Sequence, residues 1–282
     1  MAAAPLSRHA RTIAVAGVGG ALVSAVLAKQ VVRMQARIAR RVIGKPLGEE
    51  ALAADRVYKK RYGNPVDLLL LGDSIAAGLG AETPKHTLGA QLAKRVAKRT
   101  ERAVRLHTAA IVGSETSMLR AQLAGLPAGY VADVAVIVVG GNDVTHRVRT
   151  TASKRQLAEA VESLQQQGTA VVVGTCPDLG ALSAVPQPLR TLAGLASRQL
   201  AAAQRDVATD LGARAVSLAE VVGPFFVAQP DEMFAIDRFH PSGAGYRRTA
   251  KALLPSVLGA LGHDDDLPFG HHAPAALRSV TR

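Results

Sequence analysis

The run of residues Val66–Gly72, VDLLLLG, constrains the fold of this chain more than any other feature. It has the length of a strand, is almost wholly apolar and ends in glycine, which is typical of a strand buried on both faces of a parallel sheet. We expect a sheet of five parallel strands, because four later runs share this short, apolar character. They are Val104–Ala110, Val134–Val139, Ala170–Gly174 and Arg214–Leu218.

Segments with a helical spacing of apolar residues lie between and after these runs. Strands that alternate with helices imply right-handed crossovers, which cover both faces of a parallel sheet with helices. The pattern predicts an α/β fold, a three-layer α/β/α sandwich, in which ligands bind outside the carboxyl ends of the strands. The helical segments are Leu88–Thr100, Ser117–Leu126, Lys154–Gln167, Leu189–Leu211 and Ala244–Leu261.

Composition and spacing divide the 282 residues into three parts. Residues 49–262 are expected to form the folded domain, and the hydrophobic content of 48% is enough for a sizeable core. Residues 263–282 mix the acidic run Asp264–Asp266 with Pro, Gly and Ala, which predicts a flexible tail. The chain has one cysteine, Cys176, so it cannot form an internal disulfide and cysteine content does not indicate a compartment.

Residues 1–48 combine an uncharged stretch with a basic one. Ile13–Ala28 is uncharged over sixteen residues, which lies between a signal-peptide core and the roughly 20 residues of a membrane span. Residues 29–45 alternate apolar residues with arginines, as in a basic amphipathic helix at a membrane surface. We favour a signal-anchor. A cleaved signal, with Val26 and Ala28 before the cut, and a soluble helix docked on the domain stay open as alternatives.

Positive charge is concentrated in this first part. The formal net charge is +12, of which residues 1–48 supply +8 because they contain eight Lys or Arg and no acid. Aromatic residues make up only 3% of the chain and Trp is absent, so we expect no nucleic-acid partner. The charge is heavier after the uncharged stretch than before it, which favours a cytoplasmic domain, whereas an exported enzyme would need the reverse. The side of the membrane therefore stays open.

A serine follows the first predicted strand, in the sequence Gly72-Asp73-Ser74. Where a strand gives way to a helix, free backbone N–H groups and the positive end of the helix dipole favour an oxyanion. Ser74 is therefore a candidate nucleophile whose own N–H could help to hold the charge. An ordinary N-cap serine is the alternative, so this motif is weak by itself.

Two further segments are expected at the same edge of the sheet. Gly140-Gly141-Asn142-Asp143 follows the strand Val134–Val139, and the Asn142 amide is a donor suited to an oxyanion hole. Gly113 follows the second strand and could bring a backbone N–H near the same place. Both segments also have ordinary turn composition.

An acid and a base stand close together late in the chain, where Asp237 precedes His240 by three residues in DRFHP. A catalytic serine needs a base within hydrogen-bond reach, and the base needs an acceptor that fixes its tautomer. One loop could supply both groups here. By itself this spacing is more often a solvated pair in a loop.

Taken together and in this order, GDS, Gly113, GGND and the late DRFHPSGAGY resemble the signature blocks of the SGNH/GDSL esterase family. The resemblance extends over about residues 66–261, and the joint pattern is far more specific than its parts. GDSI stands here in place of the frequent GDSL, which is a mild change. The flavodoxin-like sandwich that the resemblance implies agrees with the fold expected from periodicity.

The resemblance also implies a role for each candidate residue. Ser74 would be the nucleophile, His240 the general base and Asp237 the acid that orients it. The N–H groups of Ser74 and Gly113 and the Nδ2 of Asn142 would form the oxyanion hole. No metal and no organic cofactor is implied.

The function implied in this way is a serine esterase or lipase that hydrolyses small or medium acyl esters through an acyl-enzyme. An acyltransferase with the same triad and a non-catalytic membrane-docking protein are the alternatives. The loops Ala76–Thr87 and Asp178–Leu189 are expected to set the specificity for the acyl chain and leaving group. No nucleotide-binding glycine motif follows a predicted strand.

Several remaining side chains have simpler interpretations. His146 is more typical of a surface loop than of a pocket, and Cys176 of a buried structural thiol. The tail histidines lack a cysteine or carboxylate at ligand spacing, so we expect them to be solvated rather than metal-bound. They are His263, His271 and His272.

Overall fold

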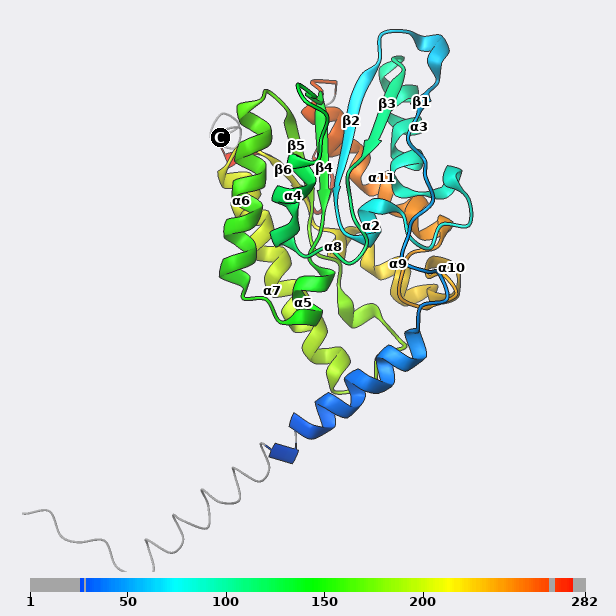
Figure 1. Ribbon diagram of the computed structural model, residues 1–282, viewed down its shortest axis with the longest axis vertical. Helices are drawn as coiled ribbons and strands as arrows, with labels where there is room; N and C mark the ends of the chain where they lie inside the picture. Colours follow the sequence, from blue (N-terminus) through cyan, green and yellow to red (C-terminus); the bar gives the residue numbers. More distant parts are fainter. Residues whose placement is uncertain (1–25, 28, 264–266, 276–282) are drawn as a thin grey trace, which may run out of the picture.

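The computed structural model describes residues 26–27, 29–263 and 267–275. Within these residues the centre of the molecule is a mixed sheet of seven strands in the order β1-β3-β2-β4-β5-β6-β7 (Figure 1). The strands are β1 (Val57–Tyr58), β2 (Val66–Gly72), β3 (Val104–Thr108), β4 (Val134–Val138), β5 (Ala170–Gly174), β6 (Arg214–Val216) and β7 (His271–His272).

The sheet differs from the sequence prediction at its two edges. The strands β2 to β6 match the five expected runs and pair with one another in parallel. The prediction of a wholly parallel, five-stranded sheet is nevertheless wrong, because β1 adds to β3 and β7 adds to β6 in the antiparallel sense. Each edge strand has only two residues, too few to give a periodic signal.

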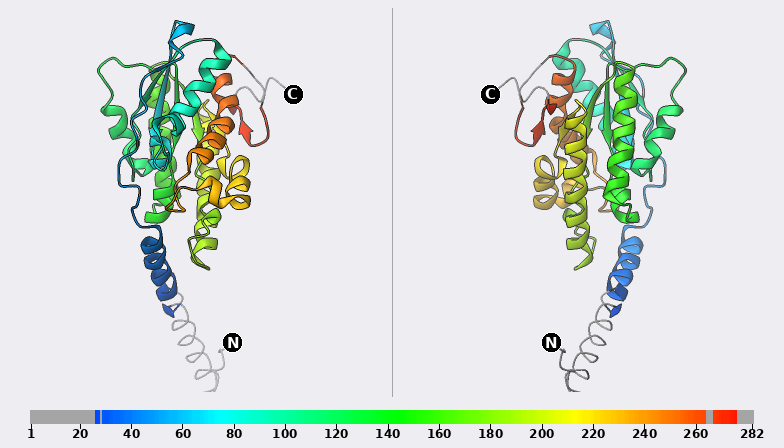
Figure 2. Two further views of the ribbon diagram at one scale, coloured as in Figure 1. Left: turned by 90° about the vertical axis from the view of Figure 1, so that its right-hand side faces the viewer. Right: turned by 90° about the vertical axis from the view of Figure 1, so that its left-hand side faces the viewer.

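Helices cover both faces of the sheet (Figure 2). One layer contains α3 (Leu88–Thr100) and α11 (Gly243–Ala260), and the other contains α4 (Leu119–Ala124), α6 (Thr150–Gln166) and α7 (Leu189–Asp210). The shorter helices are α2 (Ser74–Ala77), α5 (Gly141–His146), α8 (Leu218–Val221), α9 (Gly223–Ala228) and α10 (Pro230–Met233). Single 3-10 turns are η1 (Lys60–Tyr62), η2 (Pro84–His86), η3 (Thr116–Met118) and η4 (Leu179–Ala181).

Strand β2 shows why the chain needs both helical layers. Leu68 and Leu70 pack in the core that α3 and α11 complete, whereas Leu69 and Leu71 pack in the core shared with α4, α6 and α7. All four side chains are buried. Because successive side chains of a strand point to opposite faces, a strand that is apolar throughout must be covered on both sides. The three-layer α/β/α architecture is therefore present.

Glycine is required where β2 ends. Gly72 has a φ of 131°, and a Cβ at this position would lie 1.8 Å from the carbonyl oxygen of Val138 on β4. No side chain can be accommodated at that distance. The close approach brings the ends of β2 and β4 together immediately before Ser74.

The basic segment near the N-terminus is helical over residues 29–43 and packs on the domain. Ala39 is buried in the core that contains α3 and α11, and Ile43 packs against it. The uncharged stretch Ile13–Ala28, for which we expect a membrane anchor or signal, lies almost wholly outside the described residues. No helix within residues 26–27, 29–263 and 267–275 is long and apolar enough to cross a bilayer.

The prediction of a flexible tail with solvated histidines is wrong for residues 267–275. His271 and His272 form β7, and the Nδ1 of His271 lies 2.8 Å from the Oγ of Ser256. Burial, together with the neighbouring charges of His272 and Arg214, lowers the pKa of His271 to about 4. His263 is exposed, as expected. The acidic run that suggested a flexible tail is separated from this strand by four residues in the sequence.

Candidate active site

The expected site residues meet at the carboxyl edge of the sheet, where α/β folds bind ligands. Ser74 is the first residue of α2 and is separated from β2 only by Asp73, whereas Asn142 lies in α5 after β4. Asp237 and His240 come from the loop between α10 and α11 (Figure 1). Residues separated by more than 160 positions in the sequence thus share one site.

Ser74, His240 and Asp237 form a continuous chain of hydrogen bonds. The Oγ of Ser74 lies 3.0 Å from the Nε2 of His240, and the Nδ1 of His240 lies 2.6 Å from the Oδ2 of Asp237. The side chains of His240 and Asp237 are only 15% and 3% exposed. One ring nitrogen therefore faces the hydroxyl and the other faces the carboxyl group. This arrangement can accept a proton from the serine and stabilise the imidazolium that results.

The carboxyl group of Asp237 is held by its own loop. Its Oδ1 accepts the backbone N–H groups of Phe239 and His240, each at 3.0 Å. Burial acts to raise the pKa of Asp237, but the hydrogen bond from the His240 ring and the two backbone N–H groups outweigh it, so the pKa lies below its ordinary value. Asp237 is therefore a carboxylate at neutral pH and can stabilise a protonated His240.

Two of the three residues expected to supply oxyanion donors line the pocket, and the third does not. Ser74 and Asn142 line the pocket, and the Ser74 N–H belongs to the first turn of α2, where N–H groups have no intrahelical partner. The Asn142 Nδ2 donates one hydrogen to the carbonyl oxygen of Ser114 at 2.9 Å, and its second hydrogen is left for a ligand. Gly113 is exposed in the adjacent loop, with a φ of 83°, and is not part of the pocket wall.

Asp143 connects the Asn142 helix to the loop that carries Gly113. The Asp143 carboxyl group is buried, and its Oδ2 accepts the backbone N–H of Thr116 at 3.0 Å. Its Oδ1 accepts the hydroxyl of Ser153, in the first turn of α6. The last residue of GGND therefore positions the loop, a role that turn composition alone did not indicate.

Asp73 is a second carboxyl group, directly before Ser74. It is 2% exposed, lines the pocket and accepts the N–H of Ile75 at 2.9 Å, which caps α2. Burial raises the pKa of Asp73 to about 6, against the opposing effects of the Ile75 hydrogen bond and the nearby His240. The carboxyl group of Asp73 thus carries a proton more readily than that of an ordinary aspartate.

Two buried residues outside the expected set hold the backbone on either side of Ser74. The Tyr246 hydroxyl on α11 lies 2.5 Å from the carbonyl oxygen of Leu79, just after α2. Gln122 on α4 binds both the N–H and the carbonyl oxygen of Gly72. Tyr246 ends the GAGY block, so a signal for it was present in the sequence. Gln122 stands in an unremarkable short helix, and its role depends wholly on tertiary contact.

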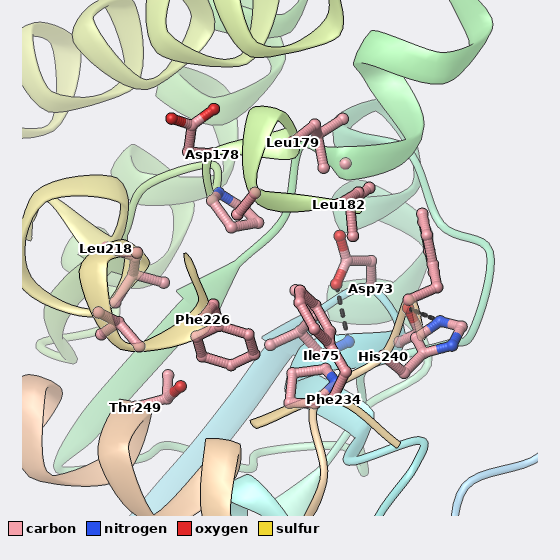
Figure 3. A pocket seen from close by; sticks show the side chains of 18 of the residues that line it. Asp73, Ile75, Asp178, Leu179, Leu182, Leu218, Phe226, Phe234, His240 and Thr249 are labelled. Carbon is pink, nitrogen blue, oxygen red and sulfur yellow. Dashed lines mark hydrogen bonds between the residues drawn. The ribbon is translucent and has the colours of Figure 1, made fainter. Parts of the chain in front are cut away.

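An apolar pocket opens beside the serine and histidine. Figure 3 shows His240 at one end of it and Leu218 and Thr249 at the other, with Ile75, Phe234 and Phe226 between them. The apolar side chains in the wall are Ile75, Leu179, Leu182, Leu218, Val222, Phe226, Phe234 and Phe239.

Only one of the two loops expected to set specificity contributes to the pocket wall. Asp178–Leu189 contributes Asp178, Leu179, Ala181 and Leu182, as expected. Ala76–Thr87 contributes no residue, and the helices α8 and α9 take its place. The helices α8 and α9 are each too short to show a periodic spacing of apolar residues, so this pattern could not predict them.

His146 and Cys176, which the sequence indicated as a surface histidine and a buried structural thiol, lie outside the pocket wall. His146 is exposed, and its Nδ1 lies 2.7 Å from the Oε1 of Glu115. Cys176 is fully buried, which raises the pKa of its thiol well above the ordinary value and keeps the group protonated. Neither residue is part of the pocket wall.

Comparison with known proteins agrees with this geometry. Residues 70–248 match the model of the GDSL-like lipase/acylhydrolase family. A GDSL-like esterase of Mycobacterium tuberculosis is 37% identical over 259 residues, which cover 88% of this chain and 82% of that esterase.

Solved structures share the fold at low sequence identity. A lipase from a goat rumen metagenome has a TM-score of 0.56 at 19% identity, covering 71% of this chain and 98% of the lipase. A variant of an acetyl xylan esterase from Geobacillus stearothermophilus has a TM-score of 0.52 at 18% identity, covering 71% of this chain and 96% of that enzyme.

Proposed function

This chain belongs to the GDSL-like lipase/acylhydrolase family, and from that premise we propose that it is a serine ester hydrolase with Ser74 as its nucleophile. The observation that carries the proposal is the chain of hydrogen bonds from the Ser74 hydroxyl through His240 to Asp237. Its two short links join a nucleophile, a base and an ionised carboxylate at the mouth of an apolar pocket. A protein that only docks on membranes has no need of this arrangement.

In the first half of the reaction the Ser74 Oγ attacks the ester carbonyl carbon while the Nε2 of His240 accepts the hydroxyl proton. Asp237 keeps the proton on Nδ1 and stabilises the imidazolium. The tetrahedral intermediate collapses when the bond to the leaving oxygen breaks, and Nε2 returns its proton to the departing alcohol. An acyl group then remains bound to Ser74.

Water completes the cycle by the same route. His240 accepts a proton from water as the water oxygen attacks the acyl carbon, and the acid leaves as Ser74 regains its proton. The Ser74 N–H and the free Asn142 Nδ2 hydrogen are the two oxyanion donors in the pocket wall, and we propose the Gly113 N–H as a third, at the rim. One such donor contributes on the order of 3 kcal/mol of transition-state stabilisation.

The pocket favours an apolar acyl group. Beyond Ser74 and His240 its wall is mainly aliphatic and aromatic, and burying apolar surface contributes about 25 cal/mol per Å². We propose small or medium acyl esters as substrates. Release of free acid without an added alcohol would distinguish hydrolysis from acyl transfer by the same triad.

We also propose that residues 1–48 associate the enzyme with a membrane, either on the cytoplasmic face or after export. The uncharged stretch Ile13–Ala28 and the excess of positive charge in this part support the proposal.

A panel of p-nitrophenyl esters, from acetate to laurate, tests the proposed activity. We expect saturable hydrolysis by the full chain, with kcat/KM rising from acetate to a medium chain length as the apolar wall is filled. Asn142→Asp and Ser74→Ala, run on the same panel, should lower kcat for every ester. Absence of hydrolysis for all chain lengths by well-folded wild type would overturn the proposal.

A further inference from the structure

The helix of residues 29–43 uses one face to bind the domain. Gln35, Ala39 and Ile43 recur every four residues and therefore share one face of the helix. Gln35 and Ala39 are 8% and 6% exposed, and Ile43 packs against the core that contains α3 and α11. This helix is thus a fixed part of the surface of the molecule, beside the start of α7 (Figure 1).

The Gln35 amide connects this face to a segment that bounds the pocket. Its Oε1 accepts the backbone N–H of Leu189 at 3.1 Å, and its Nε2 donates to the carbonyl oxygen of Gln187. The same segment begins at η4 and includes Leu182, which lines the pocket. These two hydrogen bonds therefore tie the helix to the segment that forms part of the pocket wall.

A second face of the helix is apolar and uncovered. Val31, Met34, Ile38 and Val42 recur at intervals of three and four residues, so they form one stripe along the helix. Their exposed fractions are 40%, 54%, 43% and 59%. Single exposed apolar residues are common on proteins, but a stripe that continues over three turns marks an interaction surface.

The remaining face is basic. It consists of Lys29, Arg33, Arg37, Arg40 and Arg41, all of which are exposed. Residues 1–48 contain no Asp or Glu that could neutralise this charge. A second copy of the helix would bring the same charges together and be repelled. Apolar and cationic faces on one helix match instead the acyl boundary and the phosphates of an anionic bilayer.

Further exposed apolar residues lie on α7 and in the loop between α10 and α11. Leu192 and Leu195, in the first two turns of α7, are 48% and 55% exposed and follow the Leu189 N–H that Gln35 binds. Ile236 is 77% exposed and directly precedes Asp237 in the catalytic loop. Exposed apolar side chains thus occur on elements near the site as well as on the N-terminal helix.

We propose that the helix of residues 29–43 lies in the surface of an anionic phospholipid bilayer and turns the pocket mouth toward the lipid. The apolar stripe enters the acyl boundary, the arginines contact phosphates, and Gln35 transmits this orientation to the pocket wall. The consequence for substrate rests on the proposed esterase function. Acyl esters dissolved in the bilayer would reach Ser74 without crossing water.

The position of the helix can be tested in the full chain with an environment-sensitive thiol dye. The dye is attached at Ile38→Cys or, as a matched control, at Val131→Cys. Val131 is 51% exposed and lies just before β4 begins, at the end of that strand away from the site. Cys176 is fully buried and does not compete for the dye. We expect a blue shift at position 38 with vesicles of phosphatidylglycerol and phosphatidylcholine, and none at position 131.

Two results of this experiment would overturn the proposal. The dye at position 38 could stay in water while the chain binds the vesicles, which would show that residues 13–28 attach it alone. The dye could instead shift in the absence of vesicles, at concentrations where the chain dimerises, which would show that a second copy covers the stripe.

A kinetic experiment tests the consequence for the substrate. The double variant Ile38→Glu and Val42→Glu places charge on the stripe, and Val131→Glu is the matched control. We expect roughly tenfold slower hydrolysis of an ester dissolved in anionic vesicles and an unchanged rate on a soluble short-chain ester. Equal rates of wild type and the double variant on the vesicle ester would overturn the docking proposal. Failure of wild type on the soluble ester would instead overturn the proposed function, and the dye shift would be unaffected.

Discussion

Gln122 binds the peptide groups on both sides of Gly72. Its Oε1 accepts the Gly72 N–H at 2.9 Å, and its Nε2 donates to the Gly72 carbonyl oxygen at 2.7 Å. Gly72 precedes Ser74 by two residues, so this buried amide fixes the end of β2 and the start of the nucleophile helix. The position of Ser74 therefore depends on a residue of α4 that lies outside the pocket wall.

Replacing this amide should impair both stability and turnover. Gln122→Met has a similar size but removes the acceptor of the Gly72 N–H, and an unpaired buried group of this kind costs about 1–3 kcal/mol. The Gly72 carbonyl oxygen loses one of its two donors and keeps the Ile111 N–H at 3.2 Å. We expect a lower urea midpoint and a kcat that falls more than KM rises. Arg120→Met, an exposed change on the same helix, is the control and should alter neither quantity. Equal behaviour of the two variants would show that Gln122 does not position the serine.

Two glycines near the site should tolerate alanine very differently. At Gly72 a Cβ would lie 1.8 Å from the Val138 carbonyl oxygen, so Gly72→Ala should not give a stable folded chain. At Gly113 no atom lies within 4 Å of the added Cβ, and the only cost is the φ of 83°, about 1–2 kcal/mol. Gly113→Ala should therefore fold, and its N–H should still support hydrolysis. Thermal unfolding of both variants checks this prediction. A melting temperature of Gly72→Ala equal to that of wild type would contradict it.

The buried carboxyl group of Asp73 should give stability a distinct pH dependence. Its pKa is raised to about 6, so between about pH 4 and pH 6 the folded state binds more protons than the unfolded state. This contribution to stability is present at low pH and is lost as pH rises through that window. Asp73→Asn keeps an acceptor for the Ile75 N–H but has no charge to bury.

The measurement for Asp73 is urea unfolding of wild type and Asp73→Asn across the pH range. We expect the unfolding free energy of wild type to fall relative to that of Asp73→Asn as pH rises from about 4 to 6. Above about pH 7 the difference should be constant. Other carboxyl groups cancel in this difference because both chains contain them. Parallel curves for the two chains would show that Asp73 titrates normally.

Asn142 and the triad should differ in their kinetic effects. Asn142→Ala removes a donor that strengthens in the transition state, so kcat should fall by about 10²–10³ with little change in KM. His240→Ala should lose nearly all activity, and Asp237→Ala somewhat less, because it leaves the base in place. Steady-state kinetics on one soluble ester checks the order. An unchanged kcat for Asn142→Ala would remove Asn142 from the oxyanion hole.

Ser74 and Asn142 could be predicted as site residues because each follows a strand that an apolar run marks. Once β2 and β4 are placed in parallel, Ser74 and Asn142 must lie at one edge of the sheet, and the family resemblance added Asp237 and His240. The supporting residues could not be predicted in this way. Gln122 and Asp143 act through contacts with other elements, and although Asp143 stands in the GGND block, no local pattern indicates these contacts.

The ends of the chain were predicted less well, for a different reason. Composition indicated a solvated tail after residue 262, but His271 and His272 pair with β6, because a two-residue edge strand needs only backbone hydrogen bonds and no apolar run. Composition also suggested that residues 1–48 are a separate part. Two small contacts, Ala39 in the core and Gln35 on the pocket loop, join residues 29–43 to the domain.

The most direct test of the account is capture of the acyl-enzyme on Ser74. Brief incubation of the full chain with a p-nitrophenyl ester at low pH, followed by acid quenching and peptide mass spectrometry, should add one acyl mass to the peptide that contains Gly72-Asp73-Ser74. The account predicts that this mass appears on Ser74 in wild type and is absent from Ser74→Ala, which should also lose hydrolysis. An acyl adduct on another residue, or full hydrolysis by a folded Ser74→Ala variant, would contradict it.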